Sequence, residues 1–213
     1  MDIQTFTFNP FETNCYVVSD EGRAVVIDPS CREQAEIDTL VSAIRKADLS
    51  VERILLTHAH IDHIFGCRAV SDEFGVGIEV HADDVPLLEN ASSQAAMFGI
   101  GMDEPPEPVG MLEPGSTVAV GGEQLRILHT PGHSPGSVTF HHTASGAALA
   151  GDVLFRRSIG RTDLWRGSLP ILMESIFQVL IPLGESTRIL PGHGPETTIG
   201  EERAANPFLR DGA

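Results

Sequence analysis

Histidine and aspartate side chains are concentrated in a few short segments of this chain. Four of them fall within six positions, in the sequence THAHIDH, as His58, His60, Asp62 and His63. Three more follow singly: His133 in TPGHSPGS, Asp152 in AGDVLF and His193 in PGHGPE. Imidazole and carboxylate groups bind zinc, iron or manganese without any thiolate. Seven such groups exceed a four-coordinate site and predict two divalent metal ions about 3.5–4 Å apart.

Each metal-binding segment follows a short apolar stretch that is typical of a β-strand. These stretches end in turns rich in glycine, proline or small residues, so the sheet fixes where the side chains point. In an extended turn, residues i and i+2 face the same way, and His58 and His60 can therefore share one metal ion. Asp62 and His63 enter the next helix and can face a neighbouring ion.

The remaining pattern predicts an α/β layered domain with many turns. We expect strands at 3–8, 15–19, 24–27, 53–56, 78–81, 118–120, 125–128, 137–141, 147–150 and 187–190. Helices are expected at 33–46, 62–74, 82–89, 168–181 and 199–206. Residues 91–115 show no clear period and are interpreted as one long loop.

Composition excludes several classes of function. The chain has 213 residues, 41% of them hydrophobic, and a formal net charge of −16. A surface with this charge repels nucleic acid and anionic membranes, and no apolar run approaches the ~20 residues that span a bilayer. The N-terminus lacks the features of a signal peptide, and the three cysteines do not suggest a disulfide framework. These features predict a cytoplasmic protein. We also expect a monomer or small homo-oligomer, with a small molecule as its substrate.

The histidine and aspartate motifs, together with GRTDLWRGS, PGHGPETTIG and NPFL, resemble the metallo-β-lactamase-fold hydrolases. Within them the chain is similar to the short glyoxalase II-like, or hydroxyacylglutathione hydrolase-like, subgroup. The resemblance covers nearly all residues and implies a four-layer αββα sandwich, with 1–213 as a single domain and no separate C-terminal glutathione-binding helical domain. It also assigns the ligands. His58, His60 and His133 match the first metal site, Asp62, His63 and His193 match the second, and Asp152 matches the bridge.

This resemblance implies a thioester hydrolase that uses a metal-bridging hydroxide, with zinc as the first expectation and iron or manganese as alternatives. Asp62 and Asp152 would be the catalytic carboxylates, because Asp62 can orient the hydroxide and Asp152 bridges the ions. Asp28 is expected to accept a hydrogen bond from a ligating histidine. Arg161 and Arg157, which follow Asp152 closely, are candidate contacts for a substrate carboxylate.

Other readings stay open at this point. Persulfide dioxygenases resemble the chain and would bind one iron through His58, His133 and Asp152. A lactonase or esterase of the same fold is a further alternative, and so is a metal-binding domain without catalysis. The β-lactamases are disfavoured because they are typically exported and often use a cysteine ligand. Nuclease relatives are disfavoured by the acidic charge.

Overall fold

The computed structural model of the protein describes residues 1–210, which divide into two compact units. The first unit comprises residues 1–112 and 119–124, and the second comprises residues 113–118 and 125–210. Two six-stranded sheets carry most of the fold, one in the first unit and one mainly in the second. No helix within residues 1–210 is long and apolar enough to cross a membrane.

The first sheet changes from antiparallel to parallel pairing along its width. Its strands are β1 (Asp2–Phe8), β2 (Thr13–Asp20), β3 (Arg23–Ile27), β4 (Ser50–Leu55), β5 (Ile78–Val80) and β6 (Gly110–Met111), in that order. The first three pair antiparallel through short turns, whereas β3 to β6 are parallel neighbours. The carboxyl ends of β3 and β4 therefore meet at one edge of the sheet.

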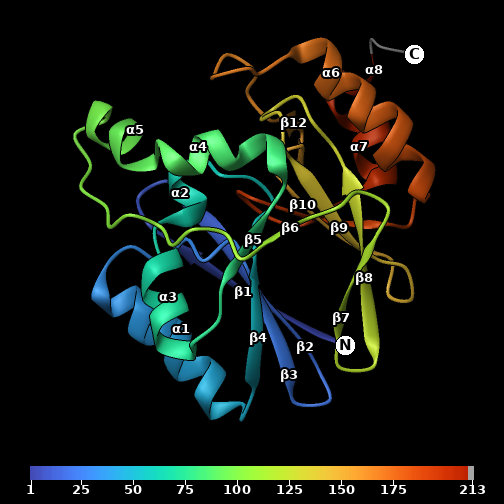
Figure 1. Cartoon of the computed structure of the whole chain (residues 1–213). Helices are drawn as coiled ribbons and strands as arrows, with labels where there is room; N and C mark the ends of the chain where they lie inside the picture. The colour runs from blue at the N-terminus through green and yellow to red at the C-terminus, as the bar shows by residue number, and fades with distance from the viewer. Residues whose placement is uncertain (211–213) are drawn as a thin grey trace. The chain divides into compact units, whose positions relative to one another are not determined.

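Helices cover one face of this first sheet (Figure 1). They are α1 (Gln34–Lys46), α2 (Ile61–Ile64), α3 (Cys67–Phe74), a 3₁₀ turn at Ala82–Asp84, α4 (Val85–Glu89) and α5 (Ala91–Met97). Leu40 and Ile44 of α1 and Val70 of α3 pack with the strands in one apolar cluster. Burial of this kind stabilises by about 25 cal/mol per Å² of apolar surface, so the cluster keeps the strand ends rigid.

The second sheet is mixed as well. Its order is β14 (Thr197–Thr198), β13 (Arg188–Pro191), β10 (Ala147–Gly151), β9 (Val138–His142), β8 (Glu123–His129) and β7 (Thr117–Val120). Strands β10 and β13 are parallel, while β9 runs antiparallel to both β8 and β10. Strands β8, β10 and β13 consequently share a direction, and their carboxyl ends point to the same edge.

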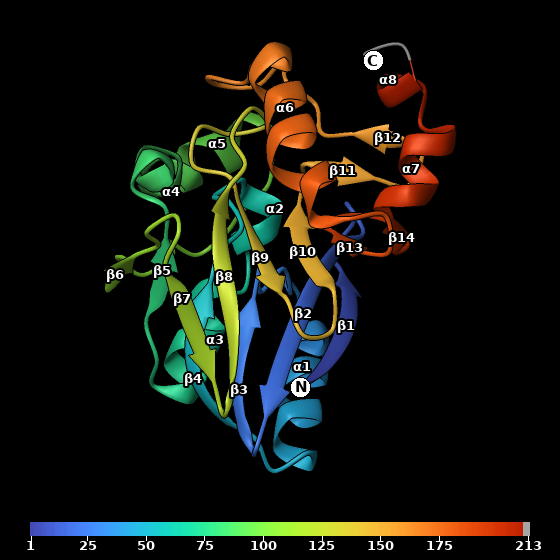
Figure 2. The ribbon, with the colours of Figure 1, turned by 90° about the vertical axis from the view of Figure 1, so that its right-hand side faces the viewer.

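A two-stranded hairpin and the C-terminal helices complete the second unit (Figure 2). The hairpin is β11 (Leu154–Phe155) with β12 (Ser158–Ile159), and the helices are α6 (Leu169–Glu174), a π-helical segment (Ser175–Leu180), a 3₁₀ turn (Ile181–Leu183), α7 (Ile199–Ala205) and α8 (Pro207–Arg210). Leu172, Ile176 and Ile199 pack on Ala148 and Ile189 of the sheet. Val153, Leu154 and Ile159, which follow β10, belong to the same apolar cluster and are held by it.

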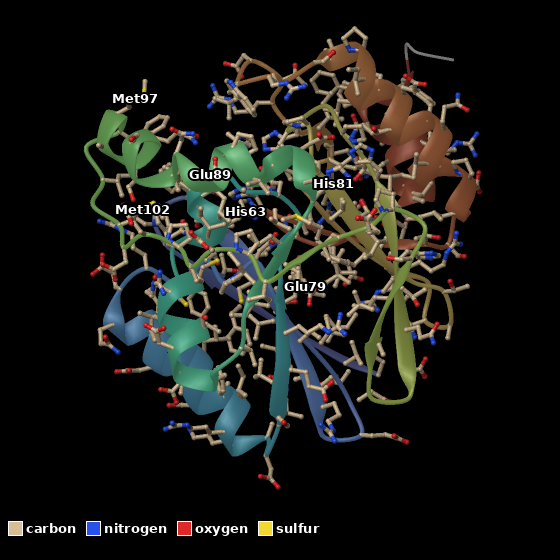
Figure 3. All side chains as sticks on the ribbon, in the orientation of Figure 1. His63, Glu79, His81, Glu89, Met97 and Met102 are labelled. Carbon is tan, nitrogen blue, oxygen red and sulfur yellow. The ribbon has the colours of Figure 1, made fainter. Side chains whose placement is uncertain are left out.

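Two expected elements differ from the structure. The single helix expected at 62–74 is two helices, α2 and α3, which meet at Gly66. A Cβ atom at Gly66 would lie 2.4 Å from Sγ of Cys31, so only glycine allows this close approach. The expected loop at 91–115 was wrong in part, because residues 91–97 form α5 and 110–111 form β6. In Figure 3, Met97 at the end of α5 points away from the body of the unit.

All three cysteines are free and completely buried in the first unit, as expected for small apolar side chains. Burial is the main cause that raises the pKa of each thiol, that of Cys31 to about 12. Only the thiolate reacts with alkylating reagents. The buried thiols should therefore be almost inert in the folded protein.

We expect iodoacetamide at pH 8 to leave the intact mass of the native protein unchanged over an hour. In guanidinium chloride the same reagent should add to all three cysteines. At a pKa of about 12, only about 10⁻⁴ of Cys31 is thiolate at pH 8. Adducts in the native protein would show that this core opens far more often than its burial indicates.

Candidate metal centre

The first group of expected ligands lies where β4 ends and α2 begins. His58 and His60 stand in the turn between them, and His60 is the N-cap of α2 with extended backbone angles. Asp62 and His63 lie in the first turn of α2, and Figure 3 shows His63 on this helix. The rings of His58 and His60 are 4.9 Å apart and those of His58 and His63 are 4.1 Å apart. The three imidazoles are almost completely buried, with at most 7% exposed.

Asp28 orients two of these histidines from the end of the neighbouring strand β3. Its Oδ2 atom lies 2.9 Å from Nδ1 of His63 and accepts a hydrogen bond 2.5 Å long from the hydroxyl of Thr57. The hydroxyl of Thr57 has only one hydrogen, so at 3.0 Å it must accept from Nδ1 of His58. Both imidazoles then carry their proton on Nδ1. Their Nε2 atoms keep the lone pair that a metal ion requires.

Asp28 therefore contacts His63, an expected ligand, and the structure adds residues that sequence reasoning missed. Asp28 has a φ of +50°, an uncommon conformation for a residue other than glycine. Its Oδ1 also accepts from the backbone N–H of Thr57 at 2.7 Å. Asp84, which is fully buried, accepts from the backbone N–H of Ala59 at 2.9 Å. The loop that carries His58 and His60 is therefore held at both ends.

The second group of expected ligands lies at the corresponding edge of the second unit's sheet. Asp152 directly follows β10, His193 comes two residues after β13, and His133 lies in the turn after β8. Nε2 of His133 and Nε2 of His193 are each 3.4 Å from Oδ2 of Asp152. The carboxylate therefore stands between two imidazoles that come from different strands. His193 is the most exposed of the three, at 27% of its side chain.

His133 is oriented by the backbone of a residue that the sequence suggested for another role. Its Nδ1 lies 2.8 Å from the carbonyl oxygen of Arg161, and a carbonyl can only accept. In the neutral tautomer with its proton on Nδ1, Nε2 of His133 has a lone pair, and this nitrogen lies 3.4 Å from Oδ2 of Asp152. Gly160 makes this packing possible, because a Cβ atom there would lie 1.9 Å from the carbonyl oxygen of Asp152 and 3.3 Å from Cβ of His133.

The arginine side chains suggested for substrate binding are both engaged by carboxylates. The guanidinium of Arg161 forms two hydrogen bonds of 2.7 Å with Asp163, and this holds the pKa of the exposed Asp163 at about 2. Arg157 donates to the fully buried Glu202 at 2.7 Å from Nη1 and also from its backbone N–H. Arg161 remains on an exposed loop, whereas Arg157, with 42% of its side chain exposed, is paired with a buried glutamate.

The two groups have the chemistry of a metal centre. Tetrahedral zinc bonds of about 2.0–2.1 Å place neighbouring ligand atoms about 3.3–3.4 Å apart. The 3.4 Å distances around Asp152 in the second unit fit this spacing. In the first unit, Nε2 of His63 lies 3.5 Å from Oδ2 of Asp62. The donors are nitrogen and carboxylate oxygen, which suit a divalent transition metal.

Comparison with known proteins identifies the family. The pattern of the metallo-beta-lactamase superfamily matches residues 8–193, which include every one of the seven expected ligands. The chain belongs to the metallo-β-lactamase superfamily. The predicted α/β fold class of this type is thereby confirmed, with two six-stranded sheets and their helices as observed.

Similar proteins refine the place of the chain in this superfamily. It is 37% identical to "Hydroxyacylglutathione hydrolase GloC" of Haemophilus influenzae, over 98% of both chains. A solved structure named "BLEG-1 B3 metallo-beta-lactamase" is 35% identical, with a TM-score of 0.90 over 98% of this chain and 99% of the other. Another, "TTHA1623 in a di-iron-bound form", is 36% identical, with a TM-score of 0.88 over 97% and 100%. The chain is thus a metallo-hydrolase by homology.

Proposed function

We propose that this protein is a metal-dependent thioester hydrolase of glyoxalase II type, with seven ligands for two divalent ions. In this proposal His58, His60 and His133 would hold one ion, Asp62, His63 and His193 would hold the other, and Asp152 would contribute to both. The observation that carries the proposal is the hydrogen bonding behind the imidazoles of His58, His63 and His133, which presents each Nε2 as a ligand.

The residues of the chain divide the work of hydrolysis. When bound, the two ions would supply a water molecule activated near neutral pH and an electrophile for the substrate carbonyl. Asp62 can accept a hydrogen bond from the attacking water and so orient it. Asp28 and the carbonyl of Arg161 accept from Nδ1 of His63 and His133 and so fix the orientation of both rings. No strong general acid is required, because a thiolate is a good leaving group.

The choice of a thioester rests on the relatives and on the sequence. The match to the Haemophilus protein named hydroxyacylglutathione hydrolase covers 98% of both chains. The relative that carries this name therefore has about the same length as the present chain. The −16 net charge disfavours nucleic acid as a substrate. Zinc is the first expectation, and the di-iron form of a similar structure makes iron the next metal to test.

A single purified sample tests the proposal. Metal content is measured first, and the same sample is then assayed with S-lactoylglutathione, other S-acyl thioesters, a chromogenic β-lactam and glutathione persulfide with oxygen. We expect about two metal ions per chain and thioester hydrolysis with kcat/KM above about 10⁴ M⁻¹s⁻¹. Oxygen uptake with one iron per chain would instead identify a persulfide dioxygenase. Preferential β-lactam turnover would overturn the thioesterase assignment.

A further inference from the structure

The turn between β1 and β2 touches Asp62, although it lies about 50 positions away in the sequence. The hydroxyl of Thr13 donates to Oδ2 of Asp62 at 2.8 Å. The side-chain amide of Asn9 donates to the backbone carbonyl of the same residue at 3.0 Å. Thr13 is completely buried and Asn9 is 9% exposed. One short turn therefore holds both the backbone and the carboxylate of an expected ligand.

This turn is anchored on its other side as well. Asn9 has a φ of +55°, and its backbone N–H donates to Oε1 of Glu36 in the first turn of α1 at 2.7 Å. Its amide nitrogen also donates to the carbonyl of Ser30 at 2.9 Å. The hydroxyl of Ser30 in turn donates to the carbonyl of Thr13 at 3.0 Å. Asn9 and Thr13, which donate to Asp62, are therefore themselves held in place by hydrogen bonds.

The hydrogen bond from Thr13 limits the freedom of the Asp62 carboxylate. Oδ2 accepts this bond and also lies 3.5 Å from Nε2 of His63, the nitrogen that would bind a metal ion in the proposed site. A carboxylate oxygen has more than one lone pair, so it can accept the hydroxyl and bind a cation at the same time. Without the hydroxyl, the carboxylate can rotate about its Cβ–Cγ bond. Binding a metal ion would then have to restore its orientation.

We propose that Asn9 and Thr13 are positioning residues that set the affinity of the metal site formed with Asp62 and His63. The inference rests on the proposed function, because it concerns one of its two metal sites. Loss of a side chain that supports a ligand lowers metal affinity about 10–100-fold. The other proposed site would use His58 and His60. These residues are held by Thr57 and by the Ala59–Asp84 hydrogen bond, so the metal affinity of that site should change little.

The test is zinc binding to metal-stripped protein, followed by competition with a chromogenic chelator. The variant Thr13→Val keeps the shape of the side chain and removes the hydroxyl, while Thr13→Ser keeps the hydroxyl. We expect Thr13→Val to weaken one of two binding steps about 10–100-fold, and Thr13→Ser to behave as the wild type. Thr7→Val is the matched control, because Thr7 lies in the same hairpin and donates to Asn14 instead.

Each other outcome has a definite meaning. Two unchanged steps in Thr13→Val, or equal weakening of both, overturn the positioning role. A wild-type protein that binds only one zinc ion overturns the binuclear site and this inference with it. If Thr13→Val is poorly folded by thermal unfolding, Asn9→Gly replaces it, since glycine accepts the positive φ and lacks the amide. The same selective loss of one step is then expected.

Discussion

Replacing Asp152 by asparagine should leave a folded protein that hydrolyses thioesters at least about 10³-fold more slowly and retains less metal. Oδ2 of Asp152 lies 3.4 Å from Nε2 of both His133 and His193, so one carboxylate serves two imidazoles. An asparagine has a single neutral oxygen, and its NH₂ group cannot bind a cation. Loss of a metal ion removes several kcal/mol of transition-state stabilisation. At 1.36 kcal/mol for each factor of ten, about 4 kcal/mol corresponds to the 10³-fold effect.

The measurement combines kcat/KM with metal content on the same preparation. The control is Asp38→Asn on α1, which removes an exposed carboxylate that accepts a hydrogen bond of 2.8 Å from the side-chain amide of Gln34. This control should keep full activity and full metal content. An Asp152→Asn variant with wild-type turnover would show that the carboxylate does not bridge metal ions. Reduced turnover at full metal content would restrict its role to orientation of the reacting water.

The sequence was sufficient to predict which residues lie at strand ends. Asp152 and His193 follow β10 and β13, and Asp28 and His58 follow β3 and β4, where each pair of strands is parallel. In such pairs the carboxyl ends coincide, so residues far apart in the sequence meet at one sheet edge. The apolar strand and the small residues after it are local signals. They can be recognised in a single sequence.

The residues behind the ligands could not be predicted in this way. Thr13, Asn9 and Asp84 are common residue types, and their contacts with the metal-binding loop span from 25 to 53 positions. No local pattern distinguishes a threonine that donates to Asp62 from one that faces solvent. Helix α5 was also not predicted, because its buried residues are only Ala91 and Ala95. Alanines four residues apart give only a weak hydrophobic period.

Arg157 shows that residue type and position alone do not reveal the partner of a side chain. An arginine soon after Asp152 is a reasonable candidate for an anionic substrate, yet its guanidinium donates to Glu202. Glu202 is completely buried and also accepts from Thr197 at 2.6 Å and from Asn206 at 2.9 Å. This network joins the β11–β12 hairpin to α7. The arrangement is that of a structural ion pair.

We therefore expect Arg157→Ala to lower the free energy of unfolding by about 3 kcal/mol while KM for the thioester stays within about twofold. Removing one partner of a buried pair leaves an uncompensated charge, which destabilises by about 3–5 kcal/mol. The lower end applies because the Arg157 side chain is 42% exposed. Urea unfolding measures the effect. Combining Arg157→Ala with Glu202→Gln should recover part of the loss, because the buried charge is then gone.

Arg203→Ala is the matched control, since Arg203 pairs with Glu185 on the surface and both side chains are at least half exposed. Exposed pairs contribute about 0–1 kcal/mol, so this variant should unfold almost as the wild type does. A substrate-binding arginine would give the opposite pattern in Arg157→Ala: unchanged unfolding and a tenfold or greater rise in KM. That result would show that the guanidinium of Arg157 binds the substrate and does not stabilise the fold through Glu202. The geometry favours the structural role because the backbone N–H of Arg157 also donates to Glu202, at 2.7 Å.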